Sequence, residues 1–237
     1  MSKTEGSGER SERRPKLPIP RVPSVGAVTG ISRRQQYSAS TRKALVMAAE
    51  SLFALRGYAA TSLDAIVADA KVTKGALYHH FSGKQGIFEA VLEDVEDQAA
   101  RQIQKAIKGV VDPSEKALAG LREFLRIVQQ PTYSRVVVQE GPAVLGRERH
   151  REQEDRSTFG IVQGLVRDLL GDEELALDDD MLQTIARIFF GALSAAGETV
   201  VGSADPAAAS IRVESAMGLF LAGIRALGEK KPDVSGS

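Results

Sequence analysis

The sequence predicts an all-α protein, with a three-helix N-terminal helix-turn-helix domain joined by a long helix to a larger helical domain. Three observations support this fold class. Apolar residues recur at helical spacing from about residue 40 to residue 227. Residues that start or end helices bound most of these segments. The sequence shows no alternating strand pattern, two-residue hairpin signal or internal repeat.

Three helices are predicted in the N-terminal domain. Apolar spacing predicts the first over 41–56, and Gly57 ends it. Thr61 is a candidate cap for a short second helix, and Thr73 for a third that runs to about His80. The intervening Ala70–Val72 is long enough only for a tight turn.

Longer helices are predicted from residue 82 onward. Ser82 and Gln85 form a capping box that opens a fourth helix ending near Gly109. Asp112 followed by Pro113 starts the next. The β-branched segment Tyr133–Gln139 is a further short helix, which Gly141–Pro142 would break. Three longer helices are predicted over 143–170, 179–201 and 206–227.

Charge and composition divide the chain into a tail, 1–37, and two domains, 38–92 and 93–237. Pro, Gly, Ser and charge dominate 1–37, which predicts a disordered basic tail. Residues 1–90 carry a net charge of +7 and residues 91–237 a net charge of −7. This asymmetry suggests that only the N-terminal part meets a polyanion. The tail is either a solvated leader or an arm that adds phosphate or minor-groove contacts.

Composition and motifs narrow the class of protein. The chain has no cysteine, which excludes disulfides and thiol nucleophiles. Its longest uncharged run inside a periodic segment, Ile188–Gly197, is short of the roughly 20 residues of a membrane span, so we expect a cytoplasmic protein. No catalytic or nucleotide-binding motif is present, and we expect neither an enzyme nor a cofactor. The adjacent pair His79–His80 lacks the third ligand and the common direction that a metal site needs.

The segment Ser62–Phe81 has the layout of a helix-turn-helix, in which the second helix enters the DNA major groove. Ala65, Ile66, Val72 and Leu77 would form the small core that fixes the angle between the helices. Lys74 suits a guanine edge or a phosphate, and Gly75 allows close approach to DNA. Thr73, Tyr78, His79 and His80 offer hydroxyl and imidazole groups, and Lys84 lies in a helix first turn that favours phosphate.

The stretch from Thr41 to about Glu93 resembles the DNA-binding domain of the TetR family of bacterial transcriptional regulators. The matching residues are Ala49, Leu52–Phe53, Gly57–Tyr58, Thr61–Ser62, Ile66, Val72–Gly75, Leu77–Tyr78, His80–Phe81, Lys84 and Ile87. One departure is Lys71, where the family usually has glycine in the turn, so either this lysine takes a less favourable backbone conformation or the turn differs slightly.

The resemblance implies a homodimer that binds a near-palindromic operator and senses a small molecule in its C-terminal domain. Such a protein would most often be a repressor that its effector releases from DNA. Six residues would face the groove: Thr73, Lys74, Gly75, Ala76, Tyr78 and His79. Three would contact phosphates: Thr61, His80 and Lys84.

Apolar residues surround most of the last two predicted helices. They include Ile188, Phe189, Phe190 and Leu193 on one helix, and Ile211, Met217, Leu219, Phe220, Leu221, Ile224 and Leu227 on the other. A helix that is apolar all round must pack against other helices on two sides. It is therefore either central in its domain or, as we expect, paired with its copy in a second subunit, which also fits the dimer bundle of the family.

A ligand pocket needs an apolar lining with a few placed polar groups. Seven residues in or beside apolar helical stretches are candidate ligand contacts: Tyr133, Gln139, Glu140, His150, Phe159, Gln163 and Thr184. Each could instead lie on the surface or in an ordinary core. His150 falls in Arg147–Arg156, whose alternating charges are typical of a solvated helix with ion pairs. The sequence does not identify the ligand.

One competing function remains on these observations. The chain could be a dimeric helical interaction module whose basic N-terminal face binds an acidic protein. Substituting Tyr78 or Lys74 separates the two hypotheses. A helix that reads sequence would lose operator preference, whereas an acidic-partner site would mainly lose charge-driven affinity.

Overall fold

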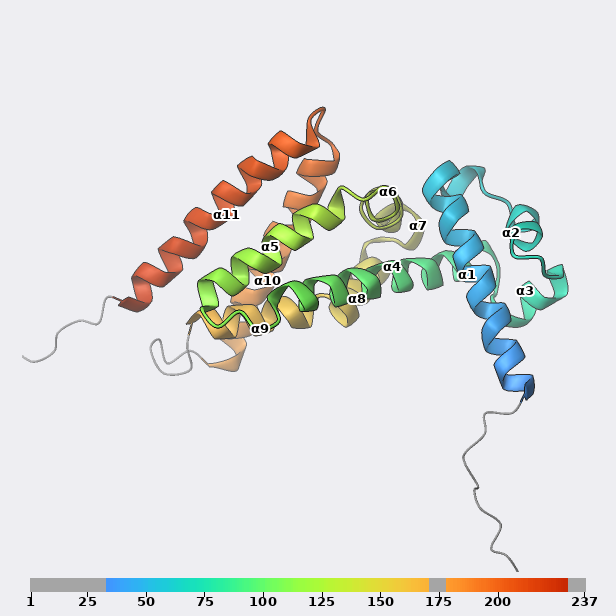
Figure 1. The fold of residues 1–237 in the computed structure, drawn as a ribbon, viewed down its shortest axis with the longest axis horizontal. Coiled ribbons are helices and arrows are strands. Elements are labelled where there is room, and N and C mark those ends of the chain that lie inside the picture. Colours follow the sequence, from blue (N-terminus) through green and yellow to red (C-terminus); the bar gives the residue numbers. More distant parts are fainter. Residues whose placement is uncertain (1–32, 171–177, 230–237) are drawn as a thin grey trace, which may run out of the picture.

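The computed structural model describes residues 33–170 and 178–229, and every element in these ranges is helical, which confirms the all-α prediction. The elements are α1 (Arg33–Ala60), α2 (Leu63–Asp69), α3 (Lys74–His80), α4 (Lys84–Ile107), α5 (Pro113–Val128), α6 (Pro131–Tyr133), the π-helix η1 (Ser134–Glu140), α7 (Gly141–Leu145), α8 (Arg147–Ser157), α9 (Phe159–Leu170), α10 (Asp179–Val201) and α11 (Pro206–Glu229). Helices α1–α3 form one end of the molecule, and α4 runs from there into the larger domain (Figure 1).

Helix α1 begins at Arg33, eight residues before its predicted start and inside the segment 1–37 that was predicted to be a tail. Residues 35–40 are mostly polar and their side chains are mainly exposed, so no apolar periodicity marks the start of the helix, although Arg and Gln are good helix formers. The rest of the predicted tail, 1–32, lies outside the described residues. Gly57 interrupts α1 with φ 82° and ψ 166°, where the sequence predicts the helix to end.

The caps of the next two helices match the predictions in part. Thr73 caps α3 by accepting a hydrogen bond from the Ala76 amide (3.2 Å). Ser62, not Thr61, caps α2, because the Thr61 hydroxyl turns inward and donates to the carbonyl oxygens of Gly57 and Leu52. In the turn between them Lys71 has φ 55°, in the left-handed region, so of the two alternatives for this lysine the less favourable backbone conformation is the one observed.

The N-cap of α4 lies one residue after Ser82, the N-cap that the predicted capping box requires. Gly83, with φ 141°, occupies the N-cap position, and no side chain caps the helix there. The helix ends at Ile107, just before Gly109, as predicted. One continuous face of α4 is buried, from Ile87 near the helix-turn-helix to Ile103 in the larger domain.

The middle of the chain departs most from the sequence prediction. Asp112 and Pro113 open α5 as expected, with the Asp112 carboxylate accepting from the Glu115 amide. Gly141–Pro142 does not break the helix that was predicted over Tyr133–Gln139, because η1 continues into α7. Proline is tolerated in the first turn of α7, since the N–H that it lacks needs no partner there. Gly141 has helical backbone and is buried.

The predicted single helix over 143–170 is three helices, α7, α8 and α9. Gly146 takes φ 80° between the first two, and Thr158 separates the last two. A glycine or threonine inside a periodic segment does not by itself predict such a break, because the conformation it adopts depends on the packing of both neighbouring helices.

Helices α10 and α11 agree with their predicted ranges and lie side by side at one edge of the larger domain (Figure 1). Several of their large apolar side chains are exposed in the single chain, among them Ile188, Ile211, Leu219 and Phe220. The side chains of Ile224 and Leu227 lie outside the described residues. By length and composition alone α10 is the one described helix that could cross a membrane, and 22% of its most apolar window is buried.

The Gly57→Ala variant tests the backbone requirement in α1. A side chain is strongly disfavoured at this φ and ψ. An added Cβ would also lie 2.6 Å from both Arg135 Nη2 and Glu140 Oε1. We expect the free energy of unfolding to fall by about 1–3 kcal/mol, measured by urea denaturation. Gly75→Ala is the control: it has helical backbone and open space, and should not destabilise the protein. Equal losses in both variants would contradict the argument.

Candidate DNA-binding surface and ligand cavity

Helix α3 presents a polar face to solvent above a small apolar core. Leu77 and Ile66 are fully buried between α2 and α3, and Ala65 and Val72 pack beside them, as predicted. On the opposite face Tyr78 is 55% exposed, and Lys74 and His79 are exposed beside it. One face of α3 is therefore open to solvent, and its side chains can contact an external partner.

The exposed face of α3 carries one lysine, whose ion pair is weak, and two histidines. Lys74 Nζ lies 2.7 Å from the Asp64 carboxylate of α2, and both side chains are largely exposed. An exposed pair of this kind contributes little stability, so the lysine can turn away at small cost. His80 is half-buried, and burial, followed by His79 and Arg42, lowers its pKa, so its ring is neutral at pH 7.

Two residues that were predicted to contact phosphates, Thr61 and Lys84, have side chains that make contacts within the protein. Thr61 is 1% exposed and its hydroxyl is used inside the domain, so the prediction of a side-chain phosphate contact does not fit its position. The Lys84 ammonium donates to the Ala59 carbonyl (3.2 Å) and stands 4.4 Å from the centre of the Tyr58 ring. It therefore fastens the start of α4 to the end of α1, and a phosphate would have to share it.

A second contact joins the end of α1 to the larger domain. The Glu140 carboxylate of η1 accepts the Tyr58 amide with both oxygens, at 3.0 and 2.8 Å. Arg135 lies 3.6 Å from the same carboxylate. Tyr58 also packs edge-on against Phe88 of α4. The residues just after the Gly57 interruption are thus held by α4 and η1 together. A π-helix such as η1 is rare, and such segments are frequent at functional sites.

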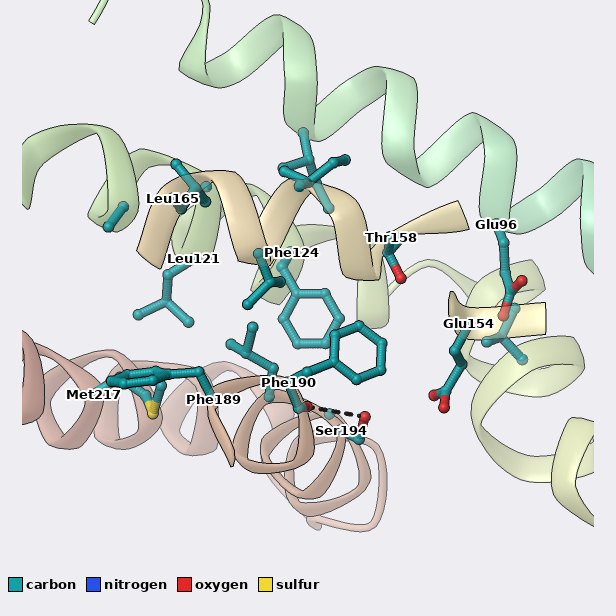
Figure 2. Close-up of a pocket in the computed structure, with 18 of the residues that line it drawn as sticks. Glu96, Leu121, Phe124, Glu154, Thr158, Leu165, Phe189, Phe190, Ser194 and Met217 are labelled. Carbon is teal, nitrogen blue, oxygen red and sulfur yellow. Dashed lines mark hydrogen bonds between the residues drawn. The ribbon is translucent and has the colours of Figure 1, made fainter. Parts of the chain in front are cut away.

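The larger domain contains a partly open cavity of about 500 Å³, which is lined by residues of every element from α4 to α11. Figure 2 shows apolar side chains at one end, including Leu121, Leu165 and Met217, and the carboxylates of Glu96 and Glu154 at the other. The rings of Phe124 and Phe190 lie between these two ends. Both the volume and the mainly apolar lining are typical of sites for small organic molecules.

At the polar end of the cavity, burial shifts the pKa values of three side chains. Burial, with Glu154 adding a smaller effect, raises the pKa of Glu96 to about 8, although Ser157 donates a hydrogen bond to this carboxyl. Burial also raises the pKa of Tyr133 and lowers that of His150. His150 Nδ1 is buried and has no hydrogen-bond partner among the described residues. Perturbed groups in a cavity mark a candidate functional site.

The structure brings two of the seven predicted ligand contacts, Tyr133 and His150, to the cavity. The other five do not line this cavity. Gln139 is exposed and donates to Ser134 Oγ, Glu140 binds the Tyr58 amide, and Thr184 is exposed on the outer side of α10. Phe159 packs in a separate cluster with Phe190 and Arg187, and Gln163 does not line the cavity.

Sequence reasoning missed Glu96, Glu154 and Glu198, which all line the cavity. A signal for Glu96 existed. It stands at helical spacing between Leu92 and Ala100, so it interrupts the buried face of α4 with a carboxylate. No comparable signal marks Glu154, which lies in the charge-rich α8.

Comparison with known proteins decides the family. The model described as "Bacterial regulatory proteins, tetR family" matches residues 45–91, and that described as "Tetracyclin repressor-like, C-terminal domain" matches residues 114–224. The chain belongs to the TetR family of transcriptional regulators. It is therefore a helix-turn-helix protein that binds DNA, and the resemblance predicted from residues 41–93 is confirmed.

Relatives of this TetR-family chain agree with that assignment. The Tn10 TetC protein of Escherichia coli is 29% identical over 67% of this chain and 81% of its own length. The transcriptional repressor KstR2 of Mycolicibacterium smegmatis is 39% identical, over 35% of this chain and 40% of its own. A TetR-family regulator from Pectobacterium atrosepticum superposes with a TM-score of 0.66 at 29% identity, covering 81% of this chain and 97% of that one.

The Glu140→Ala variant tests the contact between the two parts of this TetR-family chain. Losing a charged acceptor for the Tyr58 amide should cost about 1.5–3 kcal/mol. We expect faster hydrogen exchange at that amide and a lower free energy of unfolding. Glu148→Ala, on the exposed surface of α8, is the matched control and should change neither. Unchanged exchange at Tyr58 would show that this contact does not hold the segment.

Proposed function

We propose that the chain is a homodimeric regulator, most often acting as a repressor, that binds a near-palindromic operator and leaves it when a small molecule fills the cavity. The observation that carries this proposal is the presence, in one chain, of an exposed helix α3 and a mainly apolar cavity, which are joined by α4 and by the Glu140 contact. On this proposal the chain acts by binding alone, without catalysis, cofactor or metal, and in the cytoplasm.

The DNA contacts follow from the exposed edge of α3. Tyr78 and His79 would reach bases, and Lys74 a guanine edge or a phosphate. Thr73, Gly75 and Ala76 would lie where the backbone of α3 comes close to the groove. Gly75 has no protein atom closer than 3.9 Å to an added Cβ, so the absence of a side chain there serves an external partner rather than the core. His80 would contact a phosphate with its single N–H.

The dimer would form through α10 and α11. The exposed Ile188, Ile211, Leu219 and Phe220 need cover that the single chain does not give them. Pairing through these helices would set the two copies of α3 about 34 Å apart, one turn of DNA. It would also place an apolar face of α10 against protein.

The switch would depend on two arrangements of the same chain. The cavity reaches His150 and Pro142, which adjoin Gly141, and an added Cβ at Gly141 would lie 3.0 Å from His150. Glu140, which holds Tyr58, is the preceding residue. A ligand that binds more tightly when η1 and α7 have shifted would change the spacing of the two α3 helices.

Selection from random duplex DNA, at two salt concentrations, tests the operator proposal. We expect a near-palindromic site for the unmodified protein and a loss of sequence preference for Tyr78→Ala. Lys74→Ala should reduce the slope of log affinity against log salt by about one. Lys105→Ala, exposed near the far end of α4, is the matched control and should bind normally. Salt-dependent binding with no enriched sequence would contradict the proposal and favour a general polyanion surface, such as a site for an acidic protein.

Phe220→Glu tests the dimer interface. A charge placed at the centre of an apolar interface should shift the protein from dimer to monomer at micromolar concentration, measured by sedimentation velocity. Leu55→Glu, at an apolar position on α1 that is also largely exposed, is the control and should leave the dimer intact. A monomeric unmodified protein would contradict the proposed dimer, and a Phe220→Glu protein that remains dimeric would place the interface elsewhere.

A further inference from the structure

We propose that the cavity binds an apolar molecule carrying one protonated amine, with the ammonium group seated among Glu96, Glu154 and His150. This inference rests on the proposed function, in which the cavity is the effector site. It adds the chemical class of the effector, which neither the family nor the named relatives define.

The charge of the lining selects against anions. Three carboxyl groups face the cavity, Glu96 from α4, Glu154 from α8 and Glu198 from α10. Among the side chains that the structure describes, the lining contains no lysine or arginine. A carboxylate or phosphate ligand would find no cation to replace its water, whereas an ammonium group would find acceptors on several sides.

The carboxyl of Glu96 lacks a counter-charge in the described structure. It is 2% exposed, and side-chain hydrogen bonds from Ser157 and Gln153, which lower its pKa, do not offset the effect of burial, which raises it to about 8. The titratable groups around it are Asp97 on its own helix, Glu154 and His150 on α8 and Tyr133 on α6, with Glu198 of α10 beyond His150 and Glu50 of α1 in a separate small pocket. A bound cation would favour the carboxylate and drive its proton into solution.

His150 supplies an independent observation. Its Nε2 lies 3.7 Å from a Glu154 oxygen, while Nδ1 is buried without a partner among the described residues. A neutral imidazole whose proton faces Glu154 offers Nδ1 as an acceptor. Nδ1 lies against Gly141, where an added Cβ would be 3.2 Å from it, so a ligand N–H would reach Nδ1 only after the ring or α7 shifts.

The rest of the cavity determines the body of the ligand. Phe124 and Phe190 lie between the polar end and the apolar end that Leu121, Leu165 and Met217 form (Figure 2). Aromatic faces beside a carboxylate cluster also attract cations. A phenyl or alkyl body attached to an amine therefore fits both ends at once.

Three chain-matched probes test the proposal on the full-length protein: 4-phenylbutylamine, 4-phenylbutan-1-ol and 4-phenylbutanoate. We expect calorimetry to show the amine binding at least tenfold more tightly than the alcohol, and no binding of the carboxylate. Because the free Glu96 carboxyl titrates near pH 8, amine binding should release close to one proton at pH 7, seen by comparing buffers of different ionisation enthalpy. Its affinity should rise between pH 6 and 8, by at most about tenfold per pH unit.

Glu96→Gln should abolish both the proton release and the pH dependence while the alcohol binds as before. Glu93→Gln, an exposed carboxyl one turn away on the same helix, is the matched control and should behave like the unmodified protein. Equal or tighter binding of the alcohol, binding of the carboxylate, an affinity that falls with pH, or no amine binding at millimolar concentration would overturn the proposal. If the alcohol or carboxylate releases operator DNA, the proposed function stands and the amine inference fails. If no operator exists, amine binding in the cavity remains a separate result.

Discussion

Both parts of the molecule depend on the burial of one face of α4. Near its start Phe88 packs edge-on against Phe53 and Tyr58 of α1, inside the core of the helix-turn-helix domain. Further along, Val95, Ala99 and Ile103 belong to the same core, now against the helices of the larger domain. A single stiff helix therefore contributes to two sets of contacts that cannot move independently. Glu96 lies in the middle of this face, so a ligand in the cavity contacts the element that positions the DNA-binding helices.

The end of α1 is the second place where the two parts meet. Gly57 turns the chain so that the Tyr58 amide points at Glu140, while Lys84 holds the Ala59 carbonyl from the other side. A helix end normally leaves such groups to water or to local caps. Here a neighbouring helix and the π-helix η1 supply the partners. Because η1 runs directly into α7, which adjoins the cavity at Pro142, the path from cavity to α1 consists of residues in contact. Contact makes coupling feasible, and a difference in ligand affinity between two arrangements would drive it.

Local signals predicted much of the helical framework. The ranges of α10 and α11, the caps at Thr73 and Asp112 and the left-handed Lys71 agree with expectation, because each depends on a few neighbouring residues. The predictions fail where the local conformation depends on tertiary contacts rather than on neighbouring residues in the sequence. Thr61 and Ser62 are both acceptable caps, and the inward hydrogen bonds of Thr61 determine which one serves. Gly141–Pro142 is a common helix break, yet close packing on Leu92 and His150 keeps it helical. The cavity was predicted less well: Tyr133 and His150 reach it, whereas Glu140 lies at a different contact.

The sequence by itself determined the helical class, the helix-turn-helix and the family, because these depend on spacing along the chain and on an ordered set of residue types over about fifty positions. The tertiary structure alone decided which polar groups share the cavity. Glu96, His150 and Glu198 are brought together from α4, α8 and α10, and no local pattern encodes that meeting. It also decided how the carboxyl of Glu96 titrates, because the loss of water around a group depends on every helix that covers it.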